Sequence, residues 1–184
     1  MKKYQIIYAD PPWDERGGGK CKRGADKHYP LMKTSEIMAL HVKAIAADNA
    51  HLYLWTTNHF FPDALKVVKA WGFRYITTIT WAKPKFGLGQ YFRGQTEHCL
   101  FATRGRVPYK TLDNWSRCQS STLLQEQQDM FSEKKEHSEK PDKMRKVIEF
   151  VSDREGFNKI ELFARKKTEG WDTWGNEVDN DITL

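Results

Sequence analysis

Apolar residues along the chain follow two spacings, one typical of buried strands and one typical of amphipathic helices. Continuous or alternating apolar runs rich in Ile, Tyr, Thr and Trp indicate strands. Five such runs predict strands, at residues 4–9, 51–57, 73–82, 97–103 and 159–164. The first run ends in Asp10, Pro11, Pro12 and Trp13, where neither a helix nor a strand can continue.

Three other segments carry apolar residues three or four positions apart, which indicates helices with one buried side. Thr34 or Ser35 can cap a short helix, whose apolar positions are Ile37, Met38 and Leu40. A second helix is predicted to start near Pro62 and to end at Gly72, with an apolar side made of Leu65, Val67, Val68 and Trp71. A third is predicted to begin at Pro141 after a Ser138 cap, with inward positions Met144, Val147, Ile148 and Val151.

Strands that alternate with helices predict an α/β fold, with a mainly parallel sheet covered by helices on both faces. Ligands of such sheets bind beyond the carboxyl ends of the strands, which is where the residues after Ala9 lie. A length of 184 residues predicts one domain over residues 1–184. Two segments are expected to be loops. Residues 14–29 are glycine-rich and basic, and residues 104–136 have little apolar periodicity, with at most a short helix.

Composition narrows the class of protein. The net charge of +6 and the calculated pI of about 9.1 favour an acidic partner such as nucleic acid. Cys21, Cys99 and Cys118 are widely spaced and lack paired ligand spacing, so neither a disulfide framework nor a zinc site is predicted. The apolar run at residues 4–9 is too short for a signal peptide, and no stretch reaches membrane-spanning length. We therefore expect a soluble protein of the cytoplasm that uses no metal.

The corner at residues 10–13 has two interpretations. It is either a rigid turn with a packed tryptophan, or a grip for a planar ring that bears an amino group. In the second case the Asp10 carboxylate and the Pro11 carbonyl each accept one amino hydrogen of adenine, which directs the nitrogen lone pair towards an electrophile. Trp13, or a nearby aromatic residue such as Tyr29, would then stack on the base.

The motif is one of several ordered blocks that resemble the DPPW family of adenine methyltransferases. This family includes the catalytic subunit of the eukaryotic mRNA adenosine methyltransferase and many small bacterial and phage enzymes. The resemblance covers most of the chain through the blocks IIYADPPW, LYLWTTN, WGFRYITTITWAKP, EHCLFATRG, HSEKPD and IELFARKKTEGWDTWGNE. It implies a Rossmann-like fold in permuted order, in which DPPW precedes the strand that binds the cofactor, and it implies S-adenosylmethionine as the methyl donor.

The resemblance also assigns site residues. The catalytic motif corresponds to Asp10, Pro11, Pro12 and Trp13. Contacts to the cofactor are expected from Asp10, Lys140, Glu161, Arg165, Asn176 and Glu177, with Lys140 near the cofactor carboxylate and the last four near its ribose and adenine. Lys166, Lys167 and Thr168 depart from the family pattern, so the contacts made there by its best-known member cannot be transferred.

Local context offers plainer interpretations for some of these residues. Lys140 can simply be exposed before a helix, and Asn176 after Gly175 is a good turn. Glu161 lies in an apolar strand and therefore needs a partner, for which Arg165 and Lys140 are the candidates. His98 is interpreted as a structural histidine, because the reaction requires no general base.

Basic and aromatic residues in the two loops and around Arg93 are candidates for contacts to the polymer. The substrate-binding set is Tyr29, Lys20, Lys22, Arg23, Arg93 and Arg104, with Tyr91, Phe92, Tyr109 and Trp115 available for stacking. The leading hypothesis is N6 methylation of adenine in nucleic acid, with DNA favoured over RNA. The alternatives are a catalytically silent partner subunit of such an enzyme, and amino methylation of cytosine. A homodimer or a heterodimer with a related chain is compatible with each.

Overall fold

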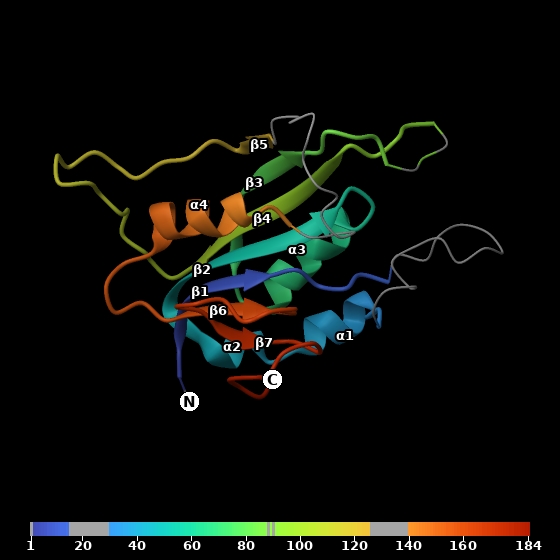
Figure 1. The fold of residues 1–184 in the computed structure, drawn as a ribbon. Coiled ribbons are helices and arrows are strands. Elements are labelled where there is room, and N and C mark those ends of the chain that lie inside the picture. The colour runs from blue at the N-terminus through green and yellow to red at the C-terminus, as the bar shows by residue number, and fades with distance from the viewer. Residues whose placement is uncertain (1, 15–29, 88, 90, 126–139) are drawn as a thin grey trace.

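The computed structural model describes residues 2–14, 30–87, 89, 91–125 and 140–184. The sheet is built from β1 (Tyr4–Ala9), β2 (Ala46–Thr57), β3 (Arg74–Ala82), β4 (Thr96–Arg104), β5 (Leu123–Gln125), β6 (Lys159–Leu162) and β7 (Asp172–Trp174). The described helices are α1 (Thr34–Ala39), α2 (Val42–Ile45), α3 (Phe61–Ala70) and α4 (Asp142–Ser152). Figure 1 shows these elements as one central sheet with helices packed against it.

The sheet has seven strands in the order β5-β3-β4-β2-β1-β6-β7. Neighbouring strands are parallel except where β4 pairs with β2 and with β3. The carboxyl ends of β1, β2, β3 and β6 therefore lie at one edge of the sheet, together with the start of β4. We call this the carboxyl edge. The predicted mainly parallel α/β fold is confirmed.

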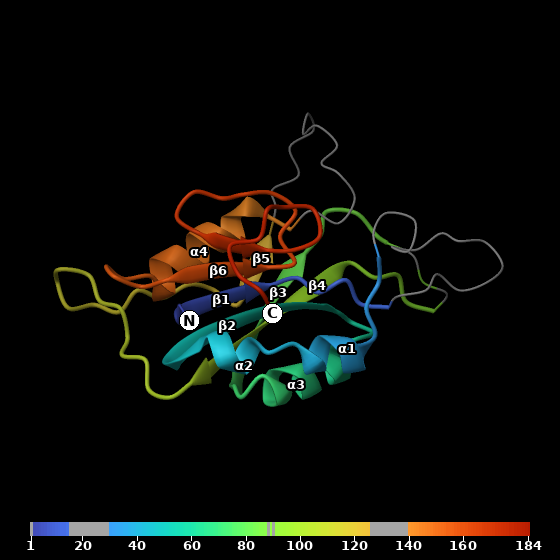
Figure 2. The same cartoon turned by 90° about the horizontal axis from the view of Figure 1, so that it is seen from below.

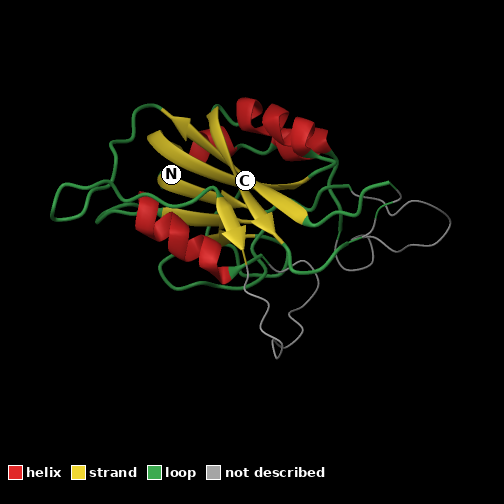
Figure 3. Cartoon of the chain, turned by 90° about the horizontal axis from the view of Figure 1, so that it is seen from above, coloured by secondary structure: helices red, strands yellow, loops and turns green. Residues whose placement is uncertain are grey.

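Helices cover both faces, with α1, α2 and α3 on one side and α4 on the other (Figures 2 and 3). The alternation of side chains along β1 explains this arrangement. Ile7 and Ala9 lie in the core under α1–α3, whereas Ile6 and Tyr8 lie in the core under α4. Tyr4 shares the face of Ile7 because the pairing of β1 with β2 shifts register between Tyr4 and Ile6.

Helix α3 begins at Phe61 with Pro62 in its first turn, close to the predicted start. It ends before Gly72, whose φ of +82° lies in the left-handed region that favours glycine. The prediction that Leu65 lies on the apolar side is wrong, because this side chain is 36% exposed. Ala64 is buried instead, together with Val67, Val68 and Trp71, and this set has the helical spacing i, i+3, i+4, i+7.

Several boundaries differ from those predicted. Strand β2 begins at Ala46, and the short helix α2 before it was not predicted. The segment 104–136 contains strand β5 rather than a helix over its described part. Strand β6 ends at Leu162 instead of residue 164, because Phe163 turns the chain with a φ of +62°. Helix α4 begins directly after Pro141, and the predicted cap Ser138 lies outside the described residues.

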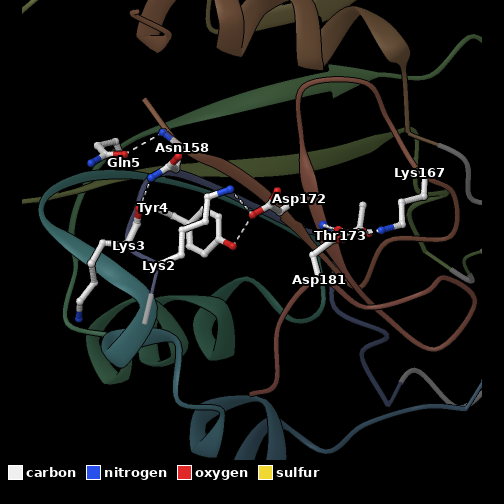
Figure 4. A network of polar contacts seen from close by, with 9 residues as sticks. All are labelled: Lys2, Lys3, Tyr4, Gln5, Asn158, Lys167, Asp172, Thr173 and Asp181. Carbon is white, nitrogen blue, oxygen red and sulfur yellow. Dashed lines mark hydrogen bonds and ion pairs between the residues drawn. The ribbon is translucent and has the colours of Figure 1, made fainter. Parts of the chain in front are cut away.

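Hydrogen bonds and ion pairs hold the C-terminal segment of the chain against the sheet (Figure 4). The Asp172 carboxylate of β7 accepts hydrogen bonds from Lys2 Nζ at 2.6 Å and from the Tyr4 hydroxyl at 2.5 Å. The Asp181 carboxylate accepts hydrogen bonds from the Thr173 backbone N–H at 2.8 Å and from Lys167 Nζ at 2.7 Å. The sequence did not predict strand β7. It is held through Asp172 by residues at the start of the chain, and through Thr173 by Asp181 near its end. Within the described ranges, no helix combines the length and apolar character needed to cross a bilayer.

Candidate active site

The DPPW corner follows β1 at the carboxyl edge, and its tryptophan is part of the core. Trp13 is 5% exposed, and its indole N–H donates to the Trp55 carbonyl at 3.0 Å. Its ring stacks on Phe60 with centroids 5.5 Å apart. The suggestion that Trp13 stacks on a base is therefore wrong for this conformation, and the packed-turn interpretation holds for this residue. Tyr29, the other suggested stacking residue, lies outside the described residues.

The two proline carbonyls of the corner each already accept one hydrogen bond. The Pro11 oxygen accepts from the Trp13 N–H at 2.9 Å, and the Pro12 oxygen accepts from the Met32 N–H at 2.8 Å. The first bond closes the corner on itself, and the second fixes it against the segment that leads to α1. A carbonyl oxygen has two lone pairs, so each can still accept one further hydrogen bond.

Asp10 is the first member of a chain of alternating charges. Its carboxylate lies 2.9 Å from Lys140 Nζ, and Lys140 Nζ lies 3.1 Å from Glu97 of β4. Glu97 also forms an ion pair with Lys83, which follows β3. The Lys140 and Glu97 side chains are 12% and 10% exposed, so these contacts are largely shielded from solvent.

These contacts perturb the pKa values of the carboxyl groups in opposite directions. Burial raises the pKa of Asp10, and the Lys140 ammonium opposes this rise. Burial also acts to raise the pKa of Glu97, but the ammonium groups of Lys140 and Lys83 outweigh it, so this pKa is lowered. Burial disfavours the ammonium form of Lys140, and the two carboxylates more than compensate, which raises its pKa.

A pocket of about 290 Å³ opens beside the corner. Its lining comes from four segments of the chain, and comprises Asp10, Pro11, Pro12, Pro30, Phe163, Ala164, Arg165, Asn176 and Glu177. A wider, open depression of about 500 Å³ adjoins it and shares Arg165, Asn176 and Glu177. The structure therefore brings together Asp10, Arg165, Asn176 and Glu177, four of the six residues that the resemblance assigns to the cofactor. Lys140 and Glu161 are not among the lining residues.

The pocket wall depends on a close approach between the segments that follow β6 and β7. The Ala164 N–H donates to the Trp174 carbonyl at 3.0 Å. A Cβ atom on Gly175 would lie 2.2 Å from the Ala164 carbonyl oxygen, so only glycine fits at this position. The Gly175 N–H is in turn bound by the Asn180 side chain at 2.7 Å.

Glu161 does not line the pocket. Its carboxylate accepts two hydrogen bonds from the Arg145 guanidinium of α4, both at 3.0 Å. The expectation that Arg165 or Lys140 is its partner is wrong. Arg165 lies beyond the end of β6, and its Nε is 4.0 Å from Glu177, while Lys140 contacts Asp10 and Glu97. Glu161 thus joins α4 to the sheet.

The basic candidates do not form one group. Lys20, Lys22 and Arg23 lie outside the described residues. Arg93 belongs to the segment between β3 and β4 at the carboxyl edge, where its Nε donates to the Gly87 carbonyl at 2.9 Å. Arg104 ends β4 at the opposite edge and donates to the Lys43 carbonyl at 2.9 Å, so its assignment to the substrate site is wrong.

Other side chains near the site have structural partners. His98 shares hydrogen bonds with Thr80 at 3.1 Å and with Asn58 at 2.8 Å, which agrees with its interpretation as a structural histidine. Cys99 and Cys118 are buried free thiols. Sequence reasoning missed Glu97, although a single acid in an apolar strand is the same signal that had pointed to Glu161.

Known proteins of one family are similar to this chain over most of its length. The sequence pattern of the MT-A70 family matches residues 4–177. The chain belongs to the MT-A70 family. It is 35% identical, over its whole length, to the Type II methyltransferase M.MunI of Mycoplasma sp, of which it covers 82%.

Two eukaryotic members of the MT-A70 family are also similar. The chain is 28% identical to the N(6)-adenosine-methyltransferase MT-A70-like protein of Drosophila melanogaster and 26% identical to the N(6)-adenosine-methyltransferase catalytic subunit METTL3 of Homo sapiens. In both comparisons 97% of this chain is matched, but it spans only 28% and 29% of those proteins. These matches confirm the predicted family, its fold class and its class of enzyme.

Proposed function

We propose that this chain transfers a methyl group from S-adenosylmethionine to the exocyclic N6 of adenine in nucleic acid, with DNA as the expected polymer. The observation that carries the proposal is the position of Asp10. Asp10 lines the same pocket as Arg165, Asn176 and Glu177, together with the two prolines that follow it. One wall can thus hold a cofactor while the corner grips an amino group.

The pocket residues suit S-adenosylmethionine in chemistry and size. The Arg165 guanidinium can pair with the carboxylate of the cofactor. The side chains of Asn176 and Glu177 can accept hydrogen bonds from its ribose hydroxyls. Phe163 offers an apolar face for a purine. A volume of about 290 Å³ lies just below the usual range for ligand pockets, roughly 300–1,000 Å³, and the open depression that adjoins it extends the space. Bound there, S-adenosylmethionine would supply the electrophilic methyl group.

The residues of the corner would orient the acceptor nitrogen. The Asp10 carboxylate accepts one amino hydrogen, and the remaining lone pair of the Pro11 carbonyl accepts the other. Because both prolines have a fixed φ and lack an N–H, the corner presents only acceptors in a fixed geometry. The amine becomes acidic once it is methylated, so its proton can leave without a dedicated base.

The test is methyl transfer from labelled S-adenosylmethionine to duplex DNA, single-stranded DNA and RNA, with the product nucleoside identified by mass spectrometry. We expect N6-methyladenine, and a loss of at least about 10²-fold in transfer rate in Asp10→Ala and Asp10→Asn, the magnitude typical of losing one such polar contact. Both variants should keep their fold and their affinity for S-adenosylmethionine within a few-fold.

The outcomes separate the alternatives. Methylcytosine as product would favour a cytosine methyltransferase. Cofactor binding without any methylated polymer would favour a silent subunit, although such a subunit is expected to lose the Asp or the aromatic residue of DPPW, and both are present here. Unchanged transfer by folded Asp10→Ala would refute the proposed mechanism.

A further inference from the structure

The segment between β3 and β4 carries aromatic side chains that the site described above does not use. Tyr91 and Phe92 are each 93% exposed, and Phe86 is 62% exposed. Aromatic side chains of this size normally bury a large apolar surface. Adjacent residues that both leave it in solvent form an apolar patch that indicates a binding surface.

Hydrogen bonds fasten the base of this segment. The Lys83 N–H donates to the Gln95 carbonyl at 2.8 Å, and the Gln95 side chain donates back to the Lys83 carbonyl at 3.0 Å. Further out, the Gly87 N–H donates to the Gly94 carbonyl at 2.6 Å. The two aromatic residues are therefore presented on a tied hairpin-like stem rather than on an open connection.

Arg93 and the glycines brace the stem. The Arg93 guanidinium lies 5.7 Å from the centroid of the Phe86 ring and donates to the Gly87 carbonyl. A Cβ atom on Gly89 would lie 1.9 Å from the Phe92 carbonyl oxygen, so this turn requires glycine. Arg93, one of the predicted substrate residues, thus contacts Phe86 and Gly87 on the other strand of its own loop.

The stem is linked to the proposed active site by ion pairs. Lys83 at its base pairs with Glu97, and Glu97 is joined through Lys140 to Asp10. In Figures 1 and 2 the segment after β3 leaves the sheet on the same side as the chain after β1, whereas the segment after β4 lies on the other side. The exposed aromatic pair therefore belongs to the edge at which the polymer would approach.

The charge of the segment favours nucleic acid as the occupant. Residues 82–96 include three cations, Lys83, Lys85 and Arg93, and no Asp or Glu. Lys83 is paired with Glu97, so Lys85 and Arg93 give this segment its net positive charge. An aromatic side chain on a basic loop is the usual platform for stacking of bases in single-stranded or opened nucleic acid, because every base offers a π face. An adenine that is lifted out of its stack also leaves its neighbours with unstacked faces.

We propose that Tyr91 and Phe92 stack on the bases that flank the target adenine, and so position the polymer over the corner. This inference rests on the proposed function and names the contact by which the same site holds its polymer. The pair contacts neither the cofactor pocket nor the amino group, so it contributes to binding of the polymer alone.

The test compares Tyr91→Ala and Phe92→Ala with the wild-type protein, using fluorescence anisotropy of labelled single-stranded and duplex oligonucleotides that contain adenine. Each substitution should weaken binding by about 5- to 150-fold, which corresponds to about 1–3 kcal/mol per stacked base. Tyr91→Phe keeps the ring and should bind within about two-fold of wild type, whereas Tyr91→Leu should behave like Tyr91→Ala. The KM for the polymer should rise in parallel, with the affinity for S-adenosylmethionine unchanged.

Trp115→Ala is the matched control. Trp115 is 87% exposed, and the sequence also offered it for stacking, but it lies in the segment between β4 and β5, which leaves β4 at the edge opposite the carboxyl edge. Its removal should therefore leave binding unchanged. Equal weakening by Trp115→Ala and Tyr91→Ala would show that any exposed aromatic residue contributes, and would overturn the inference.

The remaining outcomes separate this inference from the proposed function. Methyl transfer with a wild-type KM in both alanine variants overturns the inference and leaves the function standing. Weakened binding in the variants, with no methylation by the wild-type protein, supports stacking of the pair on nucleic acid and refutes the proposed function. If light scattering shows that the variants alter the oligomeric state while nucleic-acid binding is unchanged, the patch is a protein interface and the inference is wrong.

Discussion

Replacing Lys140 with methionine tests whether the buried charges of the active site hold the fold together. Lys140 lies between two carboxylates, at 2.9 Å from Asp10 and 3.1 Å from Glu97, and its side chain is 12% exposed. With an effective dielectric constant of about 20, a pair at about 3 Å attracts by about 5 kcal/mol. The ammonium no longer has to be desolvated in the variant, which offsets part of this loss. Removing one partner of a buried pair typically costs about 3–5 kcal/mol.

We therefore expect Lys140→Met to lose about 3 kcal/mol of unfolding free energy at pH 7, measured by urea denaturation. The sign of the pH dependence follows from Glu97, whose pKa is lowered from its ordinary 4.5 mainly by the two lysines. Its stabilising effect is present above pH 4.5 and is lost as pH falls through the lowered value. The gap between wild type and variant should therefore be widest near neutral pH and should narrow below about pH 4.5.

A surface ion pair provides the control. Lys66 Nζ lies 2.7 Å from Asp63, closer than either contact of Lys140, but its side chain is 63% exposed. Lys66→Met should cost less than about 1 kcal/mol, because water screens such pairs. If both variants lose the same small free energy, or if the deficit of Lys140→Met does not change with pH, the reasoning about the buried chain of charges is refuted.

Two further predictions concern the pocket wall and a buried histidine. Gly175→Ala places a Cβ 2.2 Å from the Ala164 carbonyl oxygen, so we expect titration calorimetry to show at least roughly ten-fold weaker S-adenosylmethionine binding, the factor that corresponds to about 1.4 kcal/mol. Gly156→Ala is the control, because its Cβ meets nothing within 4 Å. This variant should lose about 1–2 kcal/mol of unfolding free energy, because alanine is strained at a left-handed φ, and its cofactor affinity should not change. Burial, with the Arg154 charge, lowers the pKa of His51 from 6.5 to about 4, so the unfolded chain binds more protons between these values and stability falls as pH drops from 6.5 to 4. Replacement by Gln should remove up to about 3 kcal/mol of that fall in urea titrations, and an identical pH profile would contradict the assignment.

The parts of the fold that could be predicted are those set by local periodicity. The strands β1, β3 and β4 and the helix α3 each carry an apolar pattern that is complete within the element, so their positions were found within a few residues. Strand β7 was not, because its three residues include the polar Asp172 and Thr173. It exists as a strand through parallel pairing with β6 and through side chains brought from distant parts of the chain.

The choice of partner was the least predictable feature of the site. Glu161 alternates with Ile160 and Leu162, which lie in the core under α1–α3, so its side chain faces α4 and meets Arg145 there. The sequence shows the alternation but not which helix covers which face. Trp13 is a similar case, because its stacking partner Phe60 comes from the start of α3 and local context contains no sign of it.

Asp10 differs from its neighbours in what the fold does to its charge. Lys140 is stabilised in its charged form and so is Glu97, but burial raises the pKa of Asp10 despite the adjacent ammonium. The folded state therefore disfavours the ionised form of Asp10, which is the form that the proposed reaction uses. A group held in this way contributes chemistry at a cost in stability. Asp10→Asn leaves Lys140 paired with Glu97, so it should unfold no more easily than wild type while methyl transfer is lost. A clear loss of unfolding free energy in that variant would instead assign Asp10 to the scaffold.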